Sequence, residues 1–275
     1  MSLKTLWWSV IAAITLGAVL LFNYWASYQL LSTLAYAGII AAILGLANVV
    51  IPFRFLGICK RAIGAIVFGG GFALTLGALF WPASTIRAPQ PGTHLDEVMP
   101  EYQFYEKHSA RVHAGPEQVM QAVRESTFGD MKSLVTLLKI RAAAAHIPSR
   151  DNDAFSTDKR ILDAFGASGY VVGGSEHEIV MCGGANVRTE RVLRVRTLQE
   201  FSDYREPGSV KMAFGFNVKD AGAGWSTVTT ETRVLATDDV TSRGMARYWR
   251  LIVPGSGLLR RQWLDGIKRR AESGN

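Results

Sequence analysis

Three long apolar runs dominate the first third of the chain. Residues 6–25, 30–53 and 62–81 contain no Asp, Glu, Lys, Arg or His. Each run is about 20 residues long, which is enough for a helix to cross the hydrocarbon core of a bilayer. A cleaved signal peptide is the alternative for the first run, but no small-x-small cleavage site follows it, whereas further apolar runs do. The pattern predicts a membrane domain over residues 1–81 with three transmembrane helices.

Small residues recur at every fourth position of the third run, at Ala65, Gly69, Ala73 and Gly77. Such a stripe lets another helix approach closely. The partner is either another span of the same chain or a second copy of it. Because no ionisable side chain lies inside a run, the pattern indicates an anchor rather than a transporter or a proton relay.

Positive charges predict the orientation in the membrane. Lys4 precedes the first run, and Arg54, Lys60 and Arg61 lie between the second and third, whereas residues 26–29 carry no charge. The positive-inside bias therefore places the N-terminus and the second connection in the cytoplasm. An odd number of spans puts the rest of the chain on the other side. We expect a multi-pass integral membrane protein with an extracytoplasmic domain.

Residues 82–100 hold four prolines and no helical or strand period, which is typical of a linker. Beyond them, over residues 101–275, the chain alternates in the manner of half-buried strands. Pro116 is well placed to begin a helix, and Thr237, Asp238 and Asp239 offer side-chain oxygens and negative charge where a C-terminal helix would begin. We expect an α+β fold in which a curved antiparallel sheet is closed by the C-terminal helix. The strand-like runs are residues 102–114, 170–172, 178–182, 191–196, 209–219 and 226–236.

Composition narrows the possible functions. All 23 acidic residues follow residue 95, and the part after residue 81 carries 26 Lys and Arg, so this part is close to neutral. No basic face with interleaved aromatic residues appears, which argues against nucleic-acid binding. Cys59 and Cys182 form no CxxC or Cys/His pattern, and the glycine-rich stretches match no GxGxxG or P-loop motif. We therefore expect no metal and no cofactor.

Several motifs resemble the START-like, polyketide-cyclase-like (SRPBCC) superfamily. The run His108-Ser-Ala-Arg-Val-His-Ala-Gly-Pro-Glu-Gln-Val119 is similar to its opening strand and helix. Thr229-Thr-Glu-Thr-Arg-Val234 and Tyr248-Trp-Arg250 resemble the closing part of many bacterial members, which suggests a bacterial plasma (inner) membrane. The resemblance covers about residues 101–272 and implies a helix-grip fold with an apolar cavity between the sheet and the C-terminal helix. One departure is that Pro254 and two glycines split that helix, so that its second half is expected outside the grip.

Members of this superfamily bind hydrophobic small molecules or lipids, and a minority catalyse cyclisation or dehydration. If the apolar sheet face lines the cavity, Glu106 and His108 could orient the polar end of a ligand or act as an acid/base pair. Alternatively, they lie at a strand end exposed to solvent or form a satisfied pair on the rim of the sheet, and Arg194 is either a ligand contact or a solvated residue. The candidate ligand-binding residues are Phe104, Glu106, His108, Arg194, Met212, Phe214, Phe216 and Trp249.

The C-terminal helix is strongly basic. Its charged positions could contact anionic headgroups, or they form a solvated helix end. The candidate membrane-surface residues are Arg260, Arg261, Trp263, Lys268, Arg269 and Arg270. We expect a membrane-anchored START-like domain that binds a hydrophobic small molecule or lipid. The alternatives are a cyclase- or dehydratase-like enzyme and a non-catalytic structural or regulatory membrane subunit.

Overall fold

The structure is a computed structural model that describes residues 29–52, 60–88, 92–134, 136–137 and 156–273. It divides into two compact units. Unit 1 contains Met1–Pro82 together with Ala246–Pro254, and unit 2 contains Ala83–Met245 together with Gly255–Asn275. One long helix, α9 (Asp239–Glu272), therefore contributes to both units. The first predicted span, residues 6–25, lies outside the described residues.

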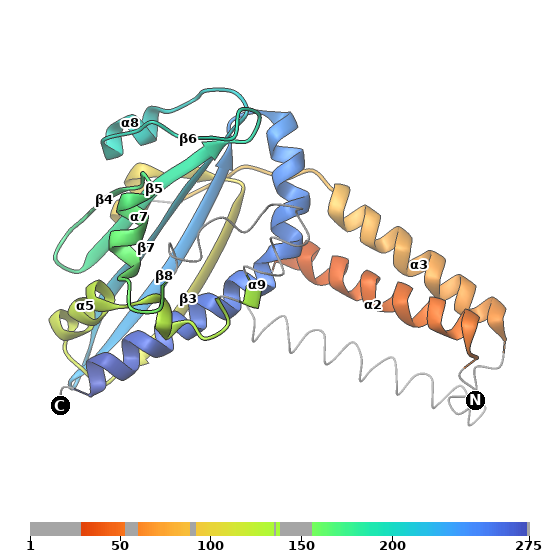
Figure 1. Cartoon of the computed structure of the whole chain (residues 1–275), viewed down its shortest axis with the longest axis horizontal. Coiled ribbons are helices and arrows are strands. Elements are labelled where there is room, and N and C mark those ends of the chain that lie inside the picture. The colour runs from red at the N-terminus through yellow and green to blue at the C-terminus, as the bar shows by residue number, and fades with distance from the viewer. Residues whose placement is uncertain (1–28, 53–59, 89–91, 135, 138–155, 274–275) are drawn as a thin grey trace. The chain divides into compact units, whose positions relative to one another are not determined.

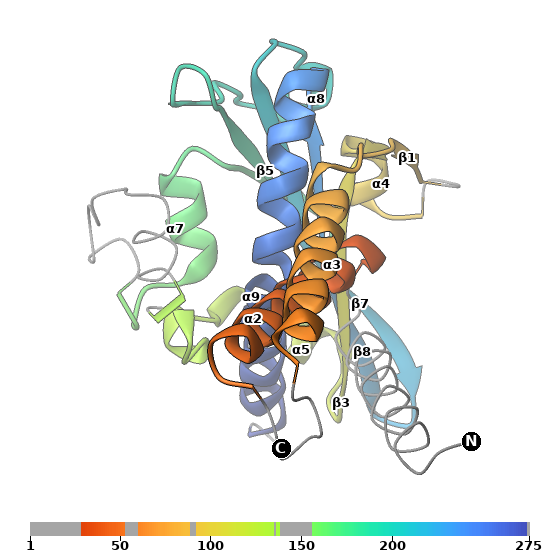
Figure 2. The ribbon, with the colours of Figure 1, turned by 90° about the vertical axis from the view of Figure 1, so that its right-hand side faces the viewer.

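In unit 1, helices α2 (Leu30–Val50) and α3 (Arg61–Phe80) lie side by side (Figure 1 and Figure 2). Glycines bring their backbones together. A methyl group on Gly38 would lie 2.7 Å from the Gly71 carbonyl oxygen, and one on Gly64 would lie 2.8 Å from that of Gly45. Close packing through small residues is typical of helices in membranes. The predicted stripe is not the surface that meets α2, because its four members are exposed on other sides of α3: Ala65, Gly69, Ala73 and Gly77.

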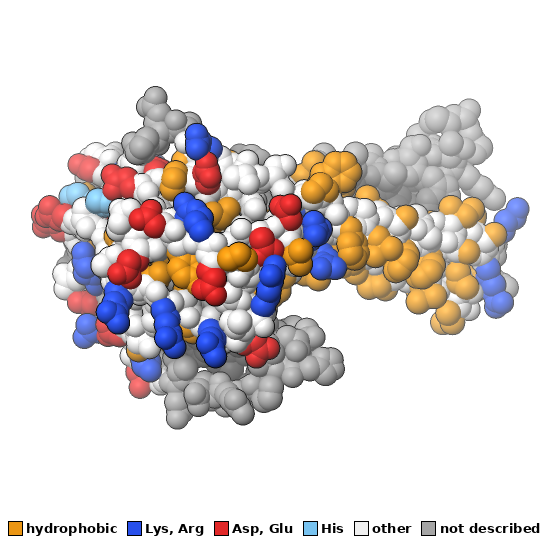
Figure 3. All heavy atoms as spheres, turned by 90° about the horizontal axis from the view of Figure 1, so that it is seen from above, with side chains coloured by type: hydrophobic (Ala, Val, Ile, Leu, Met, Phe, Trp, Pro, Cys, Tyr) orange, Lys and Arg blue, Asp and Glu red, His pale blue; other side chains and the backbone are white. Residues whose placement is uncertain are grey.

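Both helices are long and apolar enough to cross a membrane. They also expose large hydrophobic side chains, such as Ile43 at 61% and Ile66 at 74%. Figure 3 shows hydrophobic side chains gathered along the length of these helices, with Lys and Arg side chains at one end, whereas charged side chains are spread over the visible surface of unit 2. A core helix of a water-soluble protein would bury such residues. The coarse prediction of apolar anchor helices is therefore consistent with the structure for the second and third runs.

Unit 2 is built on an antiparallel sheet, as the alternation predicted. Its strands follow the order β3-β8-β7-β5-β4, and β6 pairs with β5. A tight turn at Gly222, Ala223 and Gly224, all at positive φ, joins β7 to β8. The strands are β3 (Phe104–Val112), β4 (Val171–Gly174), β5 (Glu178–Asn186), β6 (Arg191–Val192), β7 (Ser209–Gly222) and β8 (Trp225–Ala236).

Helices cover both faces of this sheet. The inner face, as we call it, packs against α5 (Pro116–Glu125), α7 (Ile161–Ala167), the 3-10 helix η2 (Phe128–Asp130) and residues 255–272 of α9. The outer face carries a second apolar cluster, to which α8 (Leu198–Asp203) contributes Phe201. The unit is thus an α+β domain with a core on each side of one sheet.

Two predictions about unit 2 were wrong. The C-terminal helix is not split: α9 continues through Pro254, and its second half packs on the sheet. A proline within a helix removes one backbone hydrogen bond, and the packing of the flanking turns compensates for this loss.

Residues 82–100 are also not a plain linker, since they hold β1 (Ile86–Arg87) and α4 (His94–Val98). Thr93 caps α4, and the Glu178 carboxylate accepts hydrogen bonds from the amides of His94 (3.0 Å) and Leu95 (3.2 Å). β1 pairs with β2 (Glu101–Tyr102).

Candidate functional site

The inner face of the sheet brings polar and aromatic side chains into two rows. In the first row Glu106 of β3 lies opposite Thr232 of β8, which lies opposite Phe214 of β7. In the next row His108 lies opposite Thr230, which lies opposite Phe216. Alternation in each strand places all six side chains on one face. The two ionisable residues, Glu106 and His108, therefore lie in an otherwise apolar and hydroxyl-bearing surface.

Glu106 and His108 form a buried pair beneath α9. Their exposed fractions are 3% and 8%, and His108 Nε2 lies 2.7 Å from Glu106 Oε1. The Ser256 hydroxyl donates to the other carboxylate oxygen, Oε2, at 2.6 Å. Gly257 allows this approach, since a methyl group there would lie 3.1 Å from Glu106 Oε1. The burial excludes the solvent-exposed alternative for these residues, whereas their mutual contact agrees with the predicted satisfied pair.

Arg260, one turn after Ser256, completes the polar cluster. Its Nη2 donates to Thr232 Oγ1 at 2.8 Å and its Nη1 to Thr230 Oγ1 at 3.5 Å. The guanidinium lies 4.6 Å from the centroid of the Phe214 ring and 5.3 Å from that of Trp263. Burial lowers the pKa of Arg260, while the charge of Glu106 opposes that shift. Within the described ranges, no carboxylate oxygen lies within 4.0 Å of this guanidinium.

This arrangement has two chemical capabilities. A guanidinium carries five N–H donors in a planar fork, which suits carboxylate or phosphate groups. Among the described residues, only hydroxyl groups accept hydrogen bonds from Arg260, so its positive charge interacts with the faces of two rings and with the more distant Glu106. A carboxylate hydrogen-bonded to an imidazole can also move a proton. The cluster is therefore suited to an anionic group, or to acid–base chemistry.

The structure brings together most, but not all, of the predicted ligand-binding residues. Phe104, Glu106, His108, Phe214 and Phe216 are buried on the inner face, and Met212 is half-buried there. Arg194 is exposed between the buried Leu193 and Val195, which agrees with the alternative that it is a solvated residue. Trp249 lies in unit 1 and is not part of this cluster.

The predicted membrane surface of the C-terminal helix was partly wrong. Trp263 is only 3% exposed, stacks edge-on with Phe216, and donates from Nε1 to Ser126 Oγ at 2.7 Å. Arg260 likewise points inward. Arg270 pairs with Asp130 and Lys268 with Glu272, while Arg261 is half-buried and Arg269 is exposed.

Sequence reasoning missed the roles of Ser256, Thr230 and Thr232. The available signal was helical spacing: Ser256, Arg260 and Trp263 recur at i, i+4 and i+7 and so share one face of α9. The two threonines share the apolar face of β8 with Val228 and Val234, which was visible in the alternation.

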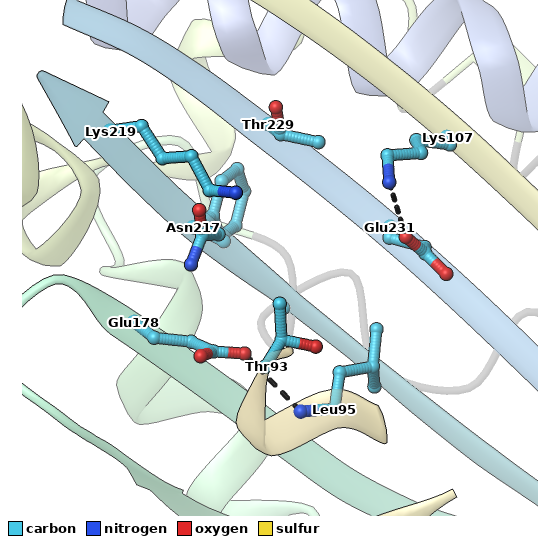
Figure 4. A pocket seen from close by; sticks show the side chains of 10 residues that line it. Thr93, Leu95, Lys107, Glu178, Asn217, Lys219, Thr229 and Glu231 are labelled. Atoms are coloured by element: carbon cyan, nitrogen blue, oxygen red, sulfur yellow. Dashed lines mark hydrogen bonds and ion pairs between the residues drawn. The ribbon is translucent and has the colours of Figure 1, made fainter. Parts of the chain in front are cut away.

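The outer face holds a groove of about 130 Å³ between α4 and strands β3, β8, β7 and β5 (Figure 4). Its charged groups are largely engaged. Lys107 Nζ lies 3.0 Å from Glu231 Oε2, and the carboxylate of Glu178 accepts from the amides of α4. These contacts attach α4 to the sheet, so the polar cluster on the inner face is the stronger candidate for a ligand-binding site.

The fold defines the class of this protein only as an α+β domain with an antiparallel sheet, joined to two apolar helices. The chain matches no protein-family model and no curated protein. It is similar to the crystal structure of a hypothetical protein from Helicobacter pylori, at 11% identity over 68% of this chain and 98% of that one. The TM-score of 0.32 is too low to transfer a fold or a function.

Proposed function

We propose that the chain is a membrane-anchored protein whose unit 2 binds an amphiphilic small molecule or lipid on the inner face of its sheet. The observation that carries this proposal is Arg260. Arg260 is half-buried, and burial lowers its pKa; a cation in this position without a carboxylate partner in the described structure is costly, and an anionic group of a ligand would compensate it. The aromatic side chains beside it, Phe214 and Trp263, are 0% and 3% exposed, so they would contact the rest of such a ligand only where the packing of the inner face opens.

The anchoring part of the proposal is supported by the exposed apolar surface of α2 and α3. We propose a multi-pass protein of a bacterial plasma membrane. The positive charges around residues 54–61 favour a cytoplasmic connection between these helices, and the three spans predicted from the sequence would then place unit 2 outside the cytoplasm.

We further propose that unit 2 is a START-like domain with a helix-grip fold. Support comes from the order of its elements. A first strand and a proline-led helix are followed by an antiparallel sheet, and a final strand leads directly into α9. The strand order and the packing of residues 255–272 on the inner face agree with a sheet that grips its C-terminal helix.

Ligand binding can be tested by native mass spectrometry of the full chain purified in detergent. The probes are a long-chain fatty acid and the alcohol of the same length. We expect the wild type to retain the acid in preference to the alcohol, and Arg260→Gln to lose that preference. Loss of one charge-assisted contact predicts about a ten-fold weaker retention of the acid. Arg269→Gln, which changes an exposed arginine of the same helix, is the matched control. Equal retention of acid and alcohol by the wild type would contradict the proposal.

A second function, a cyclase- or dehydratase-like enzyme, is favoured by the 2.7 Å contact between Glu106 and His108. A carboxylate that holds an imidazole can tune it as a general acid or base. Glu106→Gln and His108→Asn separate the two functions. If turnover of a bound amphiphile falls at least a hundred-fold in both variants while retention of the acid persists, the pair is catalytic. If no turnover is detected with the wild type, the site is a binding site alone.

A further inference from the structure

A short segment of α9, Ala246–Pro254, belongs to the same compact unit as α2 and α3. Its side chains divide into two sets. Ala246, Trp249, Arg250 and Val253 are between 1% and 3% exposed, whereas Tyr248 and Leu251 are 37% and 41% exposed. Arg247 is exposed as well. The segment therefore has one face packed within unit 1 and one face open.

Arg250 ties this segment to the end of α3. Its guanidinium Nη1 donates to the carbonyl oxygens of Ala78 (2.8 Å) and Leu79 (2.7 Å). The last four carbonyl groups of a helix have no partner within the helix, and they carry its negative dipole end. The buried guanidinium of Arg250 donates hydrogen bonds to two of these carbonyl groups and places a positive charge at the negative end of the helix dipole. The hydroxyl of Tyr36 in α2 also donates to the carbonyl of Leu251.

These contacts fix the depth of the segment in the membrane, given the proposed anchor. A helix of 20 residues just spans the hydrocarbon core, so its final turn lies at the headgroup level. Phe80 and Trp81, at the end of α3, are each 62% exposed, as expected for interfacial aromatic residues. Because Arg250 binds within this last turn, Ala246–Pro254 lies at the same level.

We propose that Arg247, Tyr248 and Leu251 form an interfacial surface that contacts the bilayer, with Arg247 binding the phosphate of an anionic phospholipid. The three residues supply a cation, an amphipathic ring and an apolar side chain, which is the composition of interfacial helices. The guanidinium of Arg247 lies 5.1 Å from the centroid of the Phe80 ring, which orients it beside the end of α3. Continuity with that helix end favours lipid over a protein partner.

Site-directed spin labels in the full chain test this inference. In a background of Cys59→Ser and Cys182→Ala, labels at positions 248 and 251 are compared in nanodiscs of phosphatidylcholine and phosphatidylglycerol. We expect both labels to be more accessible to oxygen than to a water-soluble nickel complex. A label at Lys219, which is exposed in unit 2, should show the reverse. Nickel-accessible labels at both 248 and 251 would overturn the inference.

Labels at Ile43 and Ile66 distinguish failure of the inference from failure of the anchor. If these positions are in lipid while 248 and 251 are in water, the anchor stands and the interfacial surface is wrong. If all four are in water, both proposals fail.

The anionic component is tested by native mass spectrometry of the same nanodiscs. Arg247→Gln should lower the preference for phosphatidylglycerol over phosphatidylcholine by about five-fold, whereas Arg269→Gln should leave it unchanged. An unchanged preference in Arg247→Gln would exclude the phosphate contact.

Discussion

Gly257 faces the polar cluster from α9, and its missing side chain is a requirement of the packing. A methyl group there would lie 3.1 Å from Glu106 Oε1 and 3.4 Å from His108 Nε2. Neither neighbour has much freedom to move, because the two are buried and hydrogen-bonded to each other. Gly244 of the same helix differs, because nothing lies within 4 Å of a methyl group at that position.

This contrast predicts opposite effects of one substitution at two positions. Gly244→Ala should stabilise the protein by about 0.5–1 kcal/mol, since alanine is the better helix former. Gly257→Ala should instead destabilise it by about 1 kcal/mol, because the steric cost exceeds that gain. Chemical unfolding of the full chain in detergent, followed by tryptophan fluorescence, measures both. A gain in stability at Gly257 would mean that the cluster is loosely packed.

At the scale of elements, Arg233 holds the α4–β2 segment to the outer face of the sheet. It is 5% exposed and pairs with Asp96 at 2.6 Å and Glu231 at 2.7 Å. It also donates to the carbonyl of Met99 at 3.0 Å and lies over the ring of Tyr102. The first of these partners lies in α4, so one side chain joins the segment to strand β8.

Removal of this arginine should release the segment. Arg233→Met leaves two carboxylates and a buried carbonyl uncompensated, which should cost about 3 kcal/mol. Hydrogen exchange should then rise over residues 92–102. Arg87→Met is the matched control, because the Arg87–Glu101 pair in the same region is solvent-exposed and should contribute less than about 1 kcal/mol. Equal effects of the two substitutions would show that Arg233 does not anchor α4.

For the whole molecule, two buried groups on the outer face should make stability depend on pH in opposite directions. Burial lowers the pKa of Lys211 to about 8 and raises that of Cys182 to about 12. An unfolded lysine titrates near 10.4 and an unfolded cysteine near 8.5. Between about pH 8 and 10.4 the unfolded lysine binds more protons, so the lysine contribution to stability rises with pH. Above about pH 8.5 the folded thiol binds more protons, so its contribution falls.

Single variants separate these contributions. The reference is the double variant Cys182→Ala/Lys211→Met, which lacks both groups. Relative to it, Cys182→Ala retains only the lysine, and its stability should rise from pH 8 to 10.4. Lys211→Met retains only the thiol, and its stability should fall over the same range. Unfolding midpoints of both single variants, measured at intervals of half a pH unit, test these two opposite slopes. Parallel curves for the two single variants would show that neither group titrates differently in the folded state.

The sequence predicted the strands of unit 2 well and the packing around them less well. Period-two alternation located β7 and β8, because each strand has one face in the core. The five residues of α4 are too few to show a helical period, and the surrounding prolines hid them. Charge alone could not place Arg260, since a solvated arginine and one stacked on Phe214 look the same in a basic helix. Local pattern thus predicts elements, whereas long-range contacts decide which polar residues are enclosed.

Helix α9 has a practical consequence for the handling of this protein. A fragment that starts at residue 83 would keep residues 246–254 but lose the two helices on which they pack. Ala246, Trp249 and Val253, now at most 3% exposed, would form an exposed apolar strip that promotes aggregation in water. A soluble version of the domain therefore requires polar replacements along this strip, and simple truncation should yield aggregates.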